Sequence, residues 1–223
     1  MYSQIIAAER STSLKKNGPK ELIIEISREI LNKVFVLNGS SFITEKISKS
    51  DLIVNPNDYY MIINRANVRV EIVFSEDVSN HEIIYDPYKY EHSEKQNYKV
   101  EDLKNVFEVP EGYVDTLPKW YSFKFTYPKY NLIFIRPELG ISIQIHDLRN
   151  EYWEIIDGEP IVINGNHVYY LVKTGSKFEI PINTFHSIIN PNQDIFVIIK
   201  EHWDGTFNED DISRIYNPNR YGI

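Results

Sequence analysis

The sequence predicts an all-β protein, either a sandwich or a barrel. The chain of 223 residues contains 16 Tyr and 11 Phe beside many Ile and Val, and β-branched and aromatic residues favour strands over helices. Apolar runs of strand length recur along the chain and are separated by Gly, Asn, Pro and Asp. Short strands between such turn signals are typical of all-β architectures.

Nine apolar runs are the candidate strands. In the N-terminal half they are ELIIEIS (21–27), KVFVLNG (33–39), YYMIIN (59–64) and VRVEIVF (68–74). In the C-terminal half they are NLIFIR (131–136), ISIQIH (141–146), EYWEIIDG (151–158), HVYYLV (167–172) and DIFVIIK (194–200). Helices are expected only near VEDLKNVF (100–107) and over NEDDISRIY (208–216), where Asn208 can cap a first turn that is rich in acidic residues.

Residues 75–118 interrupt this rhythm with polar, charged and proline-containing sequence. We therefore predict an N-terminal β-domain over 1–80, a linker over 81–117 and a second domain over 118–223. The segments 34–74 and 153–200 also look alike, because each contains a strand that ends in Asn-Gly or Asp-Gly and a later turn before Ile-Ile-Asn. A duplicated β-unit explains this pattern. The alternative is that two unrelated meanders share glycine turns and Ile-rich strands.

Composition excludes several classes of function. The net charge is −8 and the basic residues are scattered, so nucleic-acid binding is not expected. The chain has no cysteine, which excludes disulfides, thiolate catalysis and cysteine-based zinc sites. The N-terminal MYSQIIAAER lacks the apolar core of a signal peptide, and no run approaches the length of a membrane span. We expect a cytoplasmic protein with a small-molecule partner. The negative net charge does not exclude a small anionic substrate, because a few local Arg or Lys are enough to bind it.

Polar side chains interrupt the C-terminal strands in a pattern that favours a metal site. Gln144 and His146 are two residues apart, so they share one face of a strand. Glu151 follows after a short turn, and His186 follows a turn that begins with a proline. If neighbouring strands bring the four together, one wall carries an amide oxygen, a carboxylate and two imidazoles. This donor set suits a divalent first-row metal with positions left open for water or substrate.

The same residues resemble the two motifs of the cupin superfamily. The run Q-x-H-x-x-R-x-E-x-W-x-x-x-x-G from Gln144 to Gly158 looks like the first motif, and P-x-x-x-x-H-x-x-x-N from Pro181 to Asn190 looks like the second. The C-terminal half is more narrowly similar to the mannose-6-phosphate isomerase domain of type II bifunctional phosphomannose isomerase/GDP-mannose pyrophosphorylases, whose closing motif resembles residues 201–222. The resemblance implies a cupin jelly-roll barrel, or double-stranded β-helix, with the N-terminal half as a degenerate second cupin.

The resemblance also implies a cofactor and site residues. The implied cofactor is a divalent metal, zinc first, with manganese, cobalt, iron or nickel as alternatives. The implied metal ligands are Gln144, His146, Glu151 and His186. Three arginines are expected to contact the substrate, since a guanidinium group suits phosphate or carboxylate; they are Arg149, Arg214 and Arg220. The proton-transfer base is not identified; the candidates are Asp147, Lys173, Lys177 and Glu179.

The sequence departs from the family pattern at specific positions. Asp147 and Leu148 stand where the family has further histidines, and Asn183 stands where the second motif usually has Gly. Asn tolerates the left-handed conformation better than most residues, so this turn is expected to survive. In the N-terminal copy Tyr60 takes the position of His186, so that copy is expected to have lost its metal.

Three functions remain open. The first is a metal-dependent sugar-phosphate aldose–ketose isomerase of the mannose-6-phosphate/fructose-6-phosphate type. The second is an epimerase or ketoisomerase that acts on nucleotide-linked deoxysugars in polysaccharide biosynthesis. The third is a non-catalytic sugar- or metal-binding cupin module. A homodimer is expected, because the Ile- and Tyr-rich first half offers sheet edges for pairing.

Overall fold

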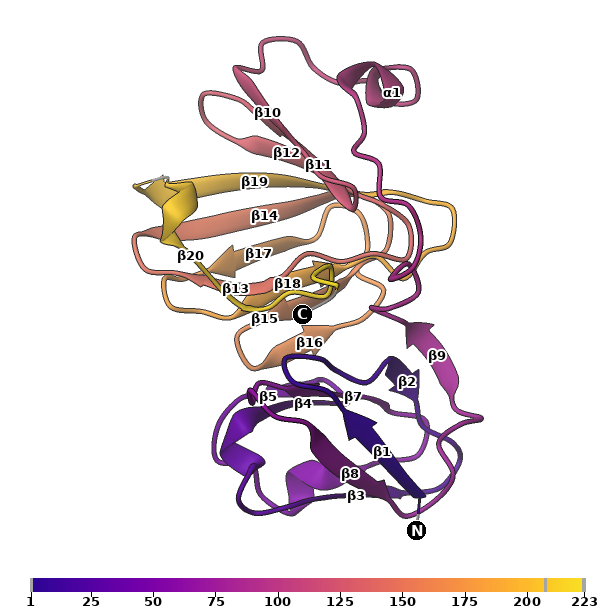
Figure 1. Ribbon diagram of the computed structural model, residues 1–223. Helices are drawn as coiled ribbons and strands as arrows, with labels where there is room; N and C mark the ends of the chain where they lie inside the picture. Colours follow the sequence, from indigo (N-terminus) through magenta and orange to yellow (C-terminus); the bar gives the residue numbers. More distant parts are fainter. Residues whose placement is uncertain (1, 207, 222–223) are drawn as a thin grey trace. The chain divides into compact units, whose positions relative to one another are not determined.

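The regular secondary structure of the protein is almost entirely β-strand (Figure 1). The computed structural model describes residues 2–206 and 208–221. Within these residues α1 (Val100–Lys104) is the one α-helix. This confirms the all-β prediction and the short helix expected near residues 100–107. The 3-10 turns are η1 (Leu31–Lys33), η2 (Ser50–Leu52) and η3 (Glu209–Asp211).

The chain forms two compact units, each described here by itself. Unit 1 contains residues 1–88 and 165–169, and unit 2 contains residues 89–164 and 170–223. The domain boundaries at residues 80 and 117 stay a prediction.

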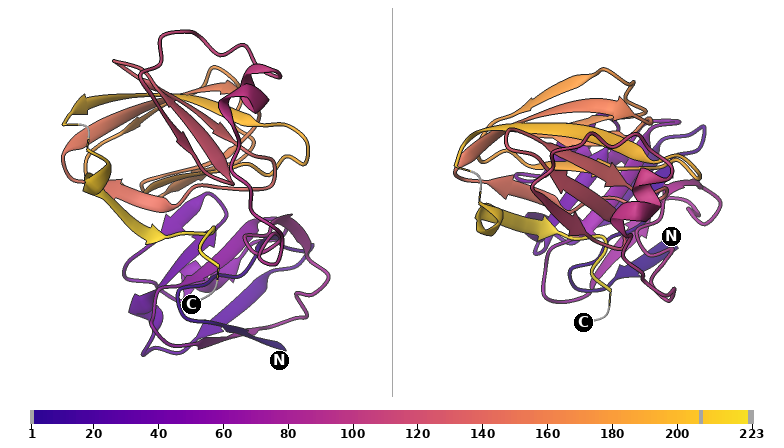
Figure 2. Two further views of the ribbon diagram at one scale, coloured as in Figure 1. Left: turned by 45° about the horizontal axis from the view of Figure 1, so that its top comes forward. Right: turned by 90° about the horizontal axis from the view of Figure 1, so that it is seen from above.

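Unit 2 consists of two antiparallel sheets that face each other (Figure 2). The first sheet has the order β10 (Asp115–Pro118), β11 (Ser122–Thr126), β12 (Asn131–Ile135), β19 (Val197–Gly205), β14 (Arg149–Asp157), β17 (Lys177–Ile180). The second has the order β20 (Ile212–Tyr216), β13 (Ile143–His146), β18 (His186–Ile189), β15 (Ile161–Asn164). This is a jelly-roll arrangement of strands, which the resemblance to the cupin motifs implied.

The interior of unit 2 is apolar between the two sheets. Trp153 and Ile199 of the first sheet pack in one buried cluster with Val162 and Ile188 of the second. A second cluster, which includes Phe125 and Phe134, receives Leu103 from α1. The inward-facing side of each strand is therefore filled mostly by β-branched and aromatic side chains, as the period of two requires.

Unit 1 also contains two antiparallel arrays. The first has the order β1 (Tyr2–Ile6), β8 (Val70–Phe74), β3 (Leu22–Ile26), β6 (Ile53–Val54). The second has the order β9 (Glu82–Tyr85), β2 (Leu14–Lys16), β7 (Tyr59–Asn64), β4 (Val34–Asn38), β5 (Ser41–Ile43), and β16 (His167–Tyr169) pairs with β5. Buried apolar side chains, among them Leu22, Tyr60 and Phe74, form its core.

The two units share one strand order. The order β1-β8-β3-β6 in unit 1 corresponds to β12-β19-β14-β17 in unit 2, and β9-β2-β7-β4 corresponds to β20-β13-β18-β15. Corresponding strands also follow each other in the same sequence along the chain. The predicted cupin-like character of the N-terminal half therefore has a topological basis.

Local details repeat between the units as well. The pairing of β2 with β9 shifts register between Leu14 and Lys15, and the pairing of β13 with β20 shifts register between Ile143 and Gln144. Asn64 and Asn190 are both fully buried. Asn64 donates a side-chain hydrogen bond to the carbonyl of Ile6 at the end of β1, and Asn190 donates one to the carbonyl of Ile135 at the end of β12. A common strand order, bulge and buried asparagine support a duplicated β-unit.

The structure corrects how the two halves align. The sequence suggested that VFVLNG (34–39) corresponds to WEIIDG (153–158). In the structure β4 pairs with β7 as β15 pairs with β18, so VFVLNG corresponds to IVING (161–165). The match between the two Ile-Ile-Asn segments is unaffected, and Tyr60 corresponds to His186.

The helix predicted over residues 208–216 is wrong. Helical backbone is confined to η3, and β20 follows it directly. Residues of β20 pair with β13, with Ile212 opposite His146. Backbone pairing with a sheet strand outweighs the local helix signals, because propensity is a weak preference beside tertiary context.

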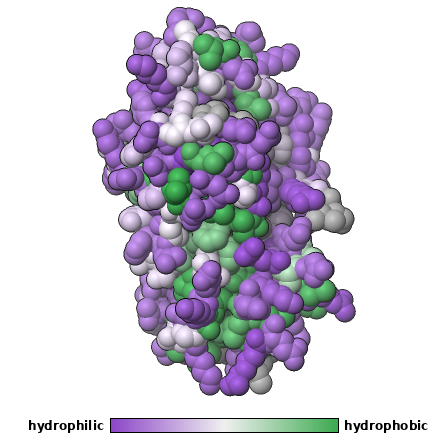
Figure 3. Space-filling view, turned by 90° about the vertical axis from the view of Figure 1, so that its left-hand side faces the viewer, coloured by the Kyte–Doolittle hydropathy of each residue, from purple (hydrophilic) through white to green (hydrophobic). Residues whose placement is uncertain are grey.

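Apolar side chains also reach the surface. Figure 3 shows hydrophobic atoms in separate areas between hydrophilic ones on one face. In unit 1 the exposed fraction is 62% for Ile5 and 54% for Ile83, on strands β1 and β9. The predicted homodimer stays a prediction.

Candidate metal and substrate site

Three strands bring two histidines and a glutamate together inside unit 2. His146 ends β13, Glu151 lies near the start of β14, and His186 begins β18. All three are buried, and one potential ligand atom from each lies within 4.8 Å of the others. Gln144 lies opposite His186 in the strand register, and its Nε2 is 3.4 Å from His186 Nε2. The four residues predicted as ligands from sequence therefore do converge; their role as ligands stays a prediction.

Short backbone contacts fix the turns that carry these residues. The backbone N–H groups of Asp147 and Leu148 donate to the carboxylate of Asp211, at 3.2 and 3.1 Å. The N–H of Asn183 donates to the carbonyl of His146 at 2.8 Å. Asn183 has φ 57°, which confirms the left-handed conformation expected there. The second motif is thus tied to the first motif at His146.

The tautomer of His186 follows from its surroundings. Its Nδ1 donates to the carbonyl of Thr184 at 2.8 Å, which leaves Nε2 as the lone-pair nitrogen, 3.6 Å from Glu151 Oε2. Burial lowers the pKa of His186 to about 4, although the charge of Glu151 opposes this shift. A neutral imidazole whose other nitrogen is held by a carbonyl is the form that binds metals.

Glu151 is ionised although it is buried. Burial alone would raise its pKa, but the hydrogen bond from His146 and the electrostatic interactions with His186, His146 and Arg149 outweigh burial and lower the pKa of Glu151 to about 2. His146 Nε2 lies 2.9 Å from Glu151 Oε1. The indole N–H of Trp153 donates to Glu151 Oε2 at 3.2 Å. The carboxylate is therefore charged and fixed in orientation.

Arg149 is buried against this carboxylate. Its Nε donates to Glu151 Oε1 at 2.9 Å, and its Nη1 donates both to the Asn208 carbonyl at 3.0 Å and to Asp211 Oδ2 at 3.4 Å. Its Nη2 lies 3.2 Å from His146 Nε2. These contacts make Arg149 a link between the site and the C-terminal segment. The predicted contact with substrate stays a prediction.

The donor set fits a divalent cation. Two imidazoles and an ionised carboxylate, with the Gln144 amide beside them, are ligands that first-row metals prefer. His146 Nδ1 is buried and has no hydrogen-bond partner among the described residues. A buried polar atom without a partner is unusual in proteins, and an imidazole nitrogen is a common metal ligand.

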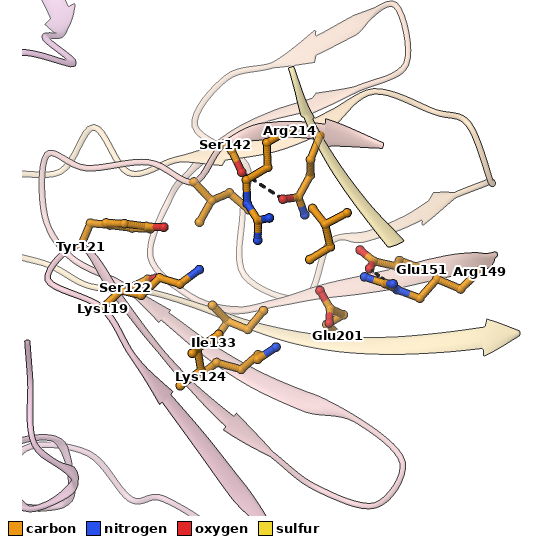
Figure 4. A pocket seen from close by; sticks show the side chains of 14 residues that line it. Lys119, Tyr121, Ser122, Lys124, Ile133, Ser142, Arg149, Glu151, Glu201 and Arg214 are labelled. Atoms are coloured by element: carbon orange, nitrogen blue, oxygen red, sulfur yellow. Dashed lines mark hydrogen bonds and ion pairs between the residues drawn. The ribbon is translucent and has the colours of Figure 1, made fainter. Parts of the chain in front are cut away.

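A pocket opens beside these side chains, and its lining carries three cationic residues in addition to Arg149 (Figure 4). Lys119 and Lys124 approach from the β10–β12 side, and Arg214 approaches from β20. Glu151 lies at the end of the pocket opposite Tyr121. Arg220, by contrast, is exposed and does not line this pocket. The site thus has an anionic end and a cationic side.

Sequence reasoning missed Lys119 and Lys124, and it also missed Glu201 on β19. Burial raises its pKa to about 8, and the charge of Glu151 adds to the rise. The sequence did contain a signal for Glu201. Val197, Ile199 and Glu201 are spaced two residues apart, so they share one face of a strand, and the first two are apolar. The four base candidates are instead exposed, and none lines the pocket: Asp147, Lys173, Lys177 and Glu179.

Residues 110–217 match the family model described as mannose-6-phosphate isomerase C-terminal. The sequence of these residues is similar to that family. The match confirms the resemblance read from the two motifs and the closing segment. It covers residues from the start of the first sheet to the end of β20.

Curated relatives match part of the chain. The alginate biosynthesis protein AlgA of Pseudomonas putida is 32% identical over 82 residues, which are 37% of this chain and 17% of AlgA. A mannose-1-phosphate guanylyltransferase of Klebsiella pneumoniae is 33% identical over 98 residues, 43% of this chain and 20% of that protein. The chain therefore spans a fifth or less of the length of these relatives.

Solved structures give weaker similarities. A cupin-superfamily sugar phosphate isomerase from Silicibacter pomeroyi matches at TM-score 0.34 and 13% identity, over 39% of this chain and 60% of that one. The capsular polysaccharide assembling protein CapF from Staphylococcus aureus matches at TM-score 0.37 and 16% identity, over 52% of this chain and 34% of that one. Among the described residues no helix has the length and apolarity needed to cross a membrane.

Proposed function

We propose that unit 2 is a metal-dependent sugar-phosphate aldose–ketose isomerase, with mannose 6-phosphate and fructose 6-phosphate as the leading substrate pair. The observation that carries the proposal is the buried His146–Glu151–His186 cluster at one end of a pocket with cationic side chains. The family match over residues 110–217 supports it. A sugar phosphate has hydroxyl oxygens for the cluster and an anionic group for the cationic side.

The cationic residues would hold the phosphate. Of the three arginines predicted to contact the substrate, Arg214 is the one that we assign to the phosphate. Lys119 and Lys124 are assigned to it as well, because they line the same pocket. Arg214 can bind phosphate through two parallel N–H groups, whereas the lysines act as point charges. Arg149 would act on Glu151 rather than on phosphate, since its nitrogens already contact Glu151, Asn208 and Asp211.

The metal would be held by His146, Glu151, His186 and the amide of Gln144. Such a cation supplies Lewis-acid polarisation of a carbonyl and its neighbouring hydroxyl. The chain supplies the rest. Trp153 and Arg149 fix the carboxylate of Glu151, and the Thr184 carbonyl fixes the ring of His186. The sugar oxygens would then meet a preorganised set of donors, which lowers the reorganisation needed in the transition state.

A coupled isomerase assay on metal-loaded protein tests the proposal. We expect mannose 6-phosphate turnover by the wild type, and at least a 100-fold loss in His146→Ala and in His186→Ala together with loss of bound metal measured by elemental analysis. His92→Ala is the matched control, because His92 is exposed and lies outside both motifs. Equal activity in all four proteins would show that the cluster is not the catalytic centre.

A second function is favoured by the names of the relatives. AlgA is named as an alginate biosynthesis protein, and XanB of Xanthomonas campestris as a xanthan biosynthesis protein. A nucleotide-linked sugar, which carries a diphosphate, would also meet Lys119, Lys124 and Arg214. Turnover of nucleotide-linked deoxysugars, with no turnover of sugar phosphates, would favour this epimerase or ketoisomerase. Binding without turnover of either class would indicate a non-catalytic module.

A further inference from the structure

Glu201 is a buried carboxylate that lines the pocket. It is not one of the predicted metal ligands Gln144, His146, Glu151 and His186, which are called the donor cluster below. It lies on β19, between Asn131 of β12 and Trp153 of β14 in the strand register. The side-chain amide of Asn131 donates to Glu201 Oε1 at 2.6 Å, and the indole N–H of Trp153 donates to Oε2 at 3.3 Å. The residue is only 7% exposed, so its carboxylate is held in one orientation.

Its position relates it directly to the donor cluster. The indole N–H of Trp153 also donates to Glu151 Oε2, at 3.2 Å, and so bridges the two carboxylates. In Figure 4 Glu201 points into the space between Arg214 and Glu151. A sugar whose C1 and C2 oxygens reach the donor cluster would therefore present the carbons that bear them to Glu201.

The fold does not require a carboxylate at this position. In unit 1 the corresponding residue is Phe74, which lies opposite Tyr2 and Ile24 as Glu201 lies opposite Asn131 and Trp153. Phe74 is fully buried in an apolar core. A hydrophobic side chain thus satisfies the same barrel position, and a buried carboxylate is costly unless it is hydrogen-bonded.

Unit 1 lacks both the carboxylate that corresponds to Glu201 and the residues of the donor cluster. Leu22 in unit 1 pairs with Val54, and Glu151 in unit 2 pairs with Ile180. Val54 lies six residues before Tyr60, and Ile180 lies six residues before His186. Leu22 therefore corresponds to Glu151. The unit without the donor residues has no glutamate at the Glu201 position, and the unit with them has one. This association indicates a role in the chemistry of the site rather than in packing.

We propose that Glu201 carries the proton between C2 and C1 of the sugar phosphate, a claim that rests on the proposed isomerase function. Its carboxylate takes the proton from C2 of the aldose, and the C2–H electron pair forms the C1=C2 bond of an enediolate. The C1=O1 π pair moves to O1. The carboxylic acid then returns the proton to C1, the O2 proton passes to O1, and C2=O2 forms. No atom or electron is gained or lost.

The Glu201→Gln variant tests this role. Gln keeps the size of the side chain and the oxygen that accepts from Asn131, but it cannot accept a proton. We expect kcat to fall at least 100-fold, the usual size of a lost general base, with KM within about threefold of the wild type. Incorporation of deuterium from D2O at C1 and C2, followed by NMR, should fall by the same factor. Metal content should stay that of the wild type.

Two further variants complete the test. Glu179→Gln is the matched control, because Glu179 is exposed on β17 and should keep wild-type kcat and exchange. Glu201→Asp keeps a carboxylate and should retain measurable exchange, with kcat between those of the wild type and Glu201→Gln. If Glu201→Gln fails to fold, the loss of kcat at unchanged metal content in Glu201→Asp carries the test.

The outcomes separate the two proposals. A wild-type protein that turns over sugar phosphates, with kcat and deuterium exchange unchanged in both Glu201 variants, overturns the role of Glu201 and leaves the isomerase function standing. A wild-type protein without turnover or exchange on any sugar phosphate overturns both. A Glu201→Gln variant that also loses its metal, with wild-type exchange once metal is resupplied, shows a structural role and overturns the proposal.

Discussion

Arg149 shows how single residues connect the site to the stability of unit 2. Its guanidinium contacts two buried carboxylates, Glu151 at 2.9 Å and Asp211 at 3.4 Å. Burying a charge is tolerated only when it is paired and hydrogen-bonded. Removing the cation would leave two buried anions facing each other across the space that it fills. Arg149 thus stabilises the folded structure of unit 2, independently of any role in the chemistry.

We expect Arg149→Met to destabilise unit 2 by about 3–5 kcal/mol, the usual result of removing one partner from a buried ion pair. Arg214→Met is the matched control and should cost less than about 1 kcal/mol, because Arg214 is exposed. Urea unfolding followed by tryptophan fluorescence measures this, since all three tryptophans, Trp120, Trp153 and Trp203, lie in unit 2. Equal stabilities of the two variants would contradict the structural role of Arg149.

At the scale of elements, the turn before β18 positions His186 relative to β13. Asn183 adopts φ 57° and donates its backbone N–H to the His146 carbonyl at 2.8 Å. Left-handed backbone is costly for residues with a branched Cβ and easy for Gly and Asn. The turn therefore depends on the residue type at 183, although its side chain is exposed.

Asn183→Val should lower the free energy of unfolding of unit 2 by roughly 1–2 kcal/mol and weaken metal binding, because the strained turn carries His186. Asn183→Gly keeps the backbone conformation and should stay within about 1 kcal/mol of the wild type with unchanged metal affinity. Calorimetry and metal titration distinguish these variants. If Val and Gly behave alike, the backbone conformation at 183 does not support the site.

The sequence was sufficient where local pattern and motif agree. The strand character of most segments, the convergence of His146, Glu151 and His186, and the left-handed Asn183 all follow from spacing and residue type. The strand at residues 212–216 could not be seen, because its pairing with β13 depends on where the chain returns in space. Glu201 was missed for a related reason: its contacts with Asn131 and Trp153 come from strands 70 and 48 residues away.

At the scale of the whole molecule, the same strand order supports two different interiors. Unit 2 places Gln144 opposite His186, and unit 1 places Lys15 opposite Tyr60 at the corresponding positions. Lys15 Nζ donates to the Val78 carbonyl at 2.7 Å, and the Tyr60 hydroxyl lies 2.8 Å from His81 Nδ1. An ammonium group and a buried phenol thus stand where unit 2 has an amide and an imidazole.

This difference predicts a stoichiometry of one metal ion per chain. Lys15 is a cation, and burial lowers its pKa although the charges of Asp77 and Asp86 oppose the shift. Leu22, which takes the place of Glu151, has no ligand atom. A second divalent cation would therefore meet like charge and a carbon side chain in unit 1, whereas unit 2 offers two imidazoles and a carboxylate. Elemental analysis should find one ion in the wild type and none in the double variant His146→Ala/His186→Ala. Two ions in the wild type, or one retained in the double variant, would place a metal outside the cluster, and the asymmetry between the units would then have another physical cause.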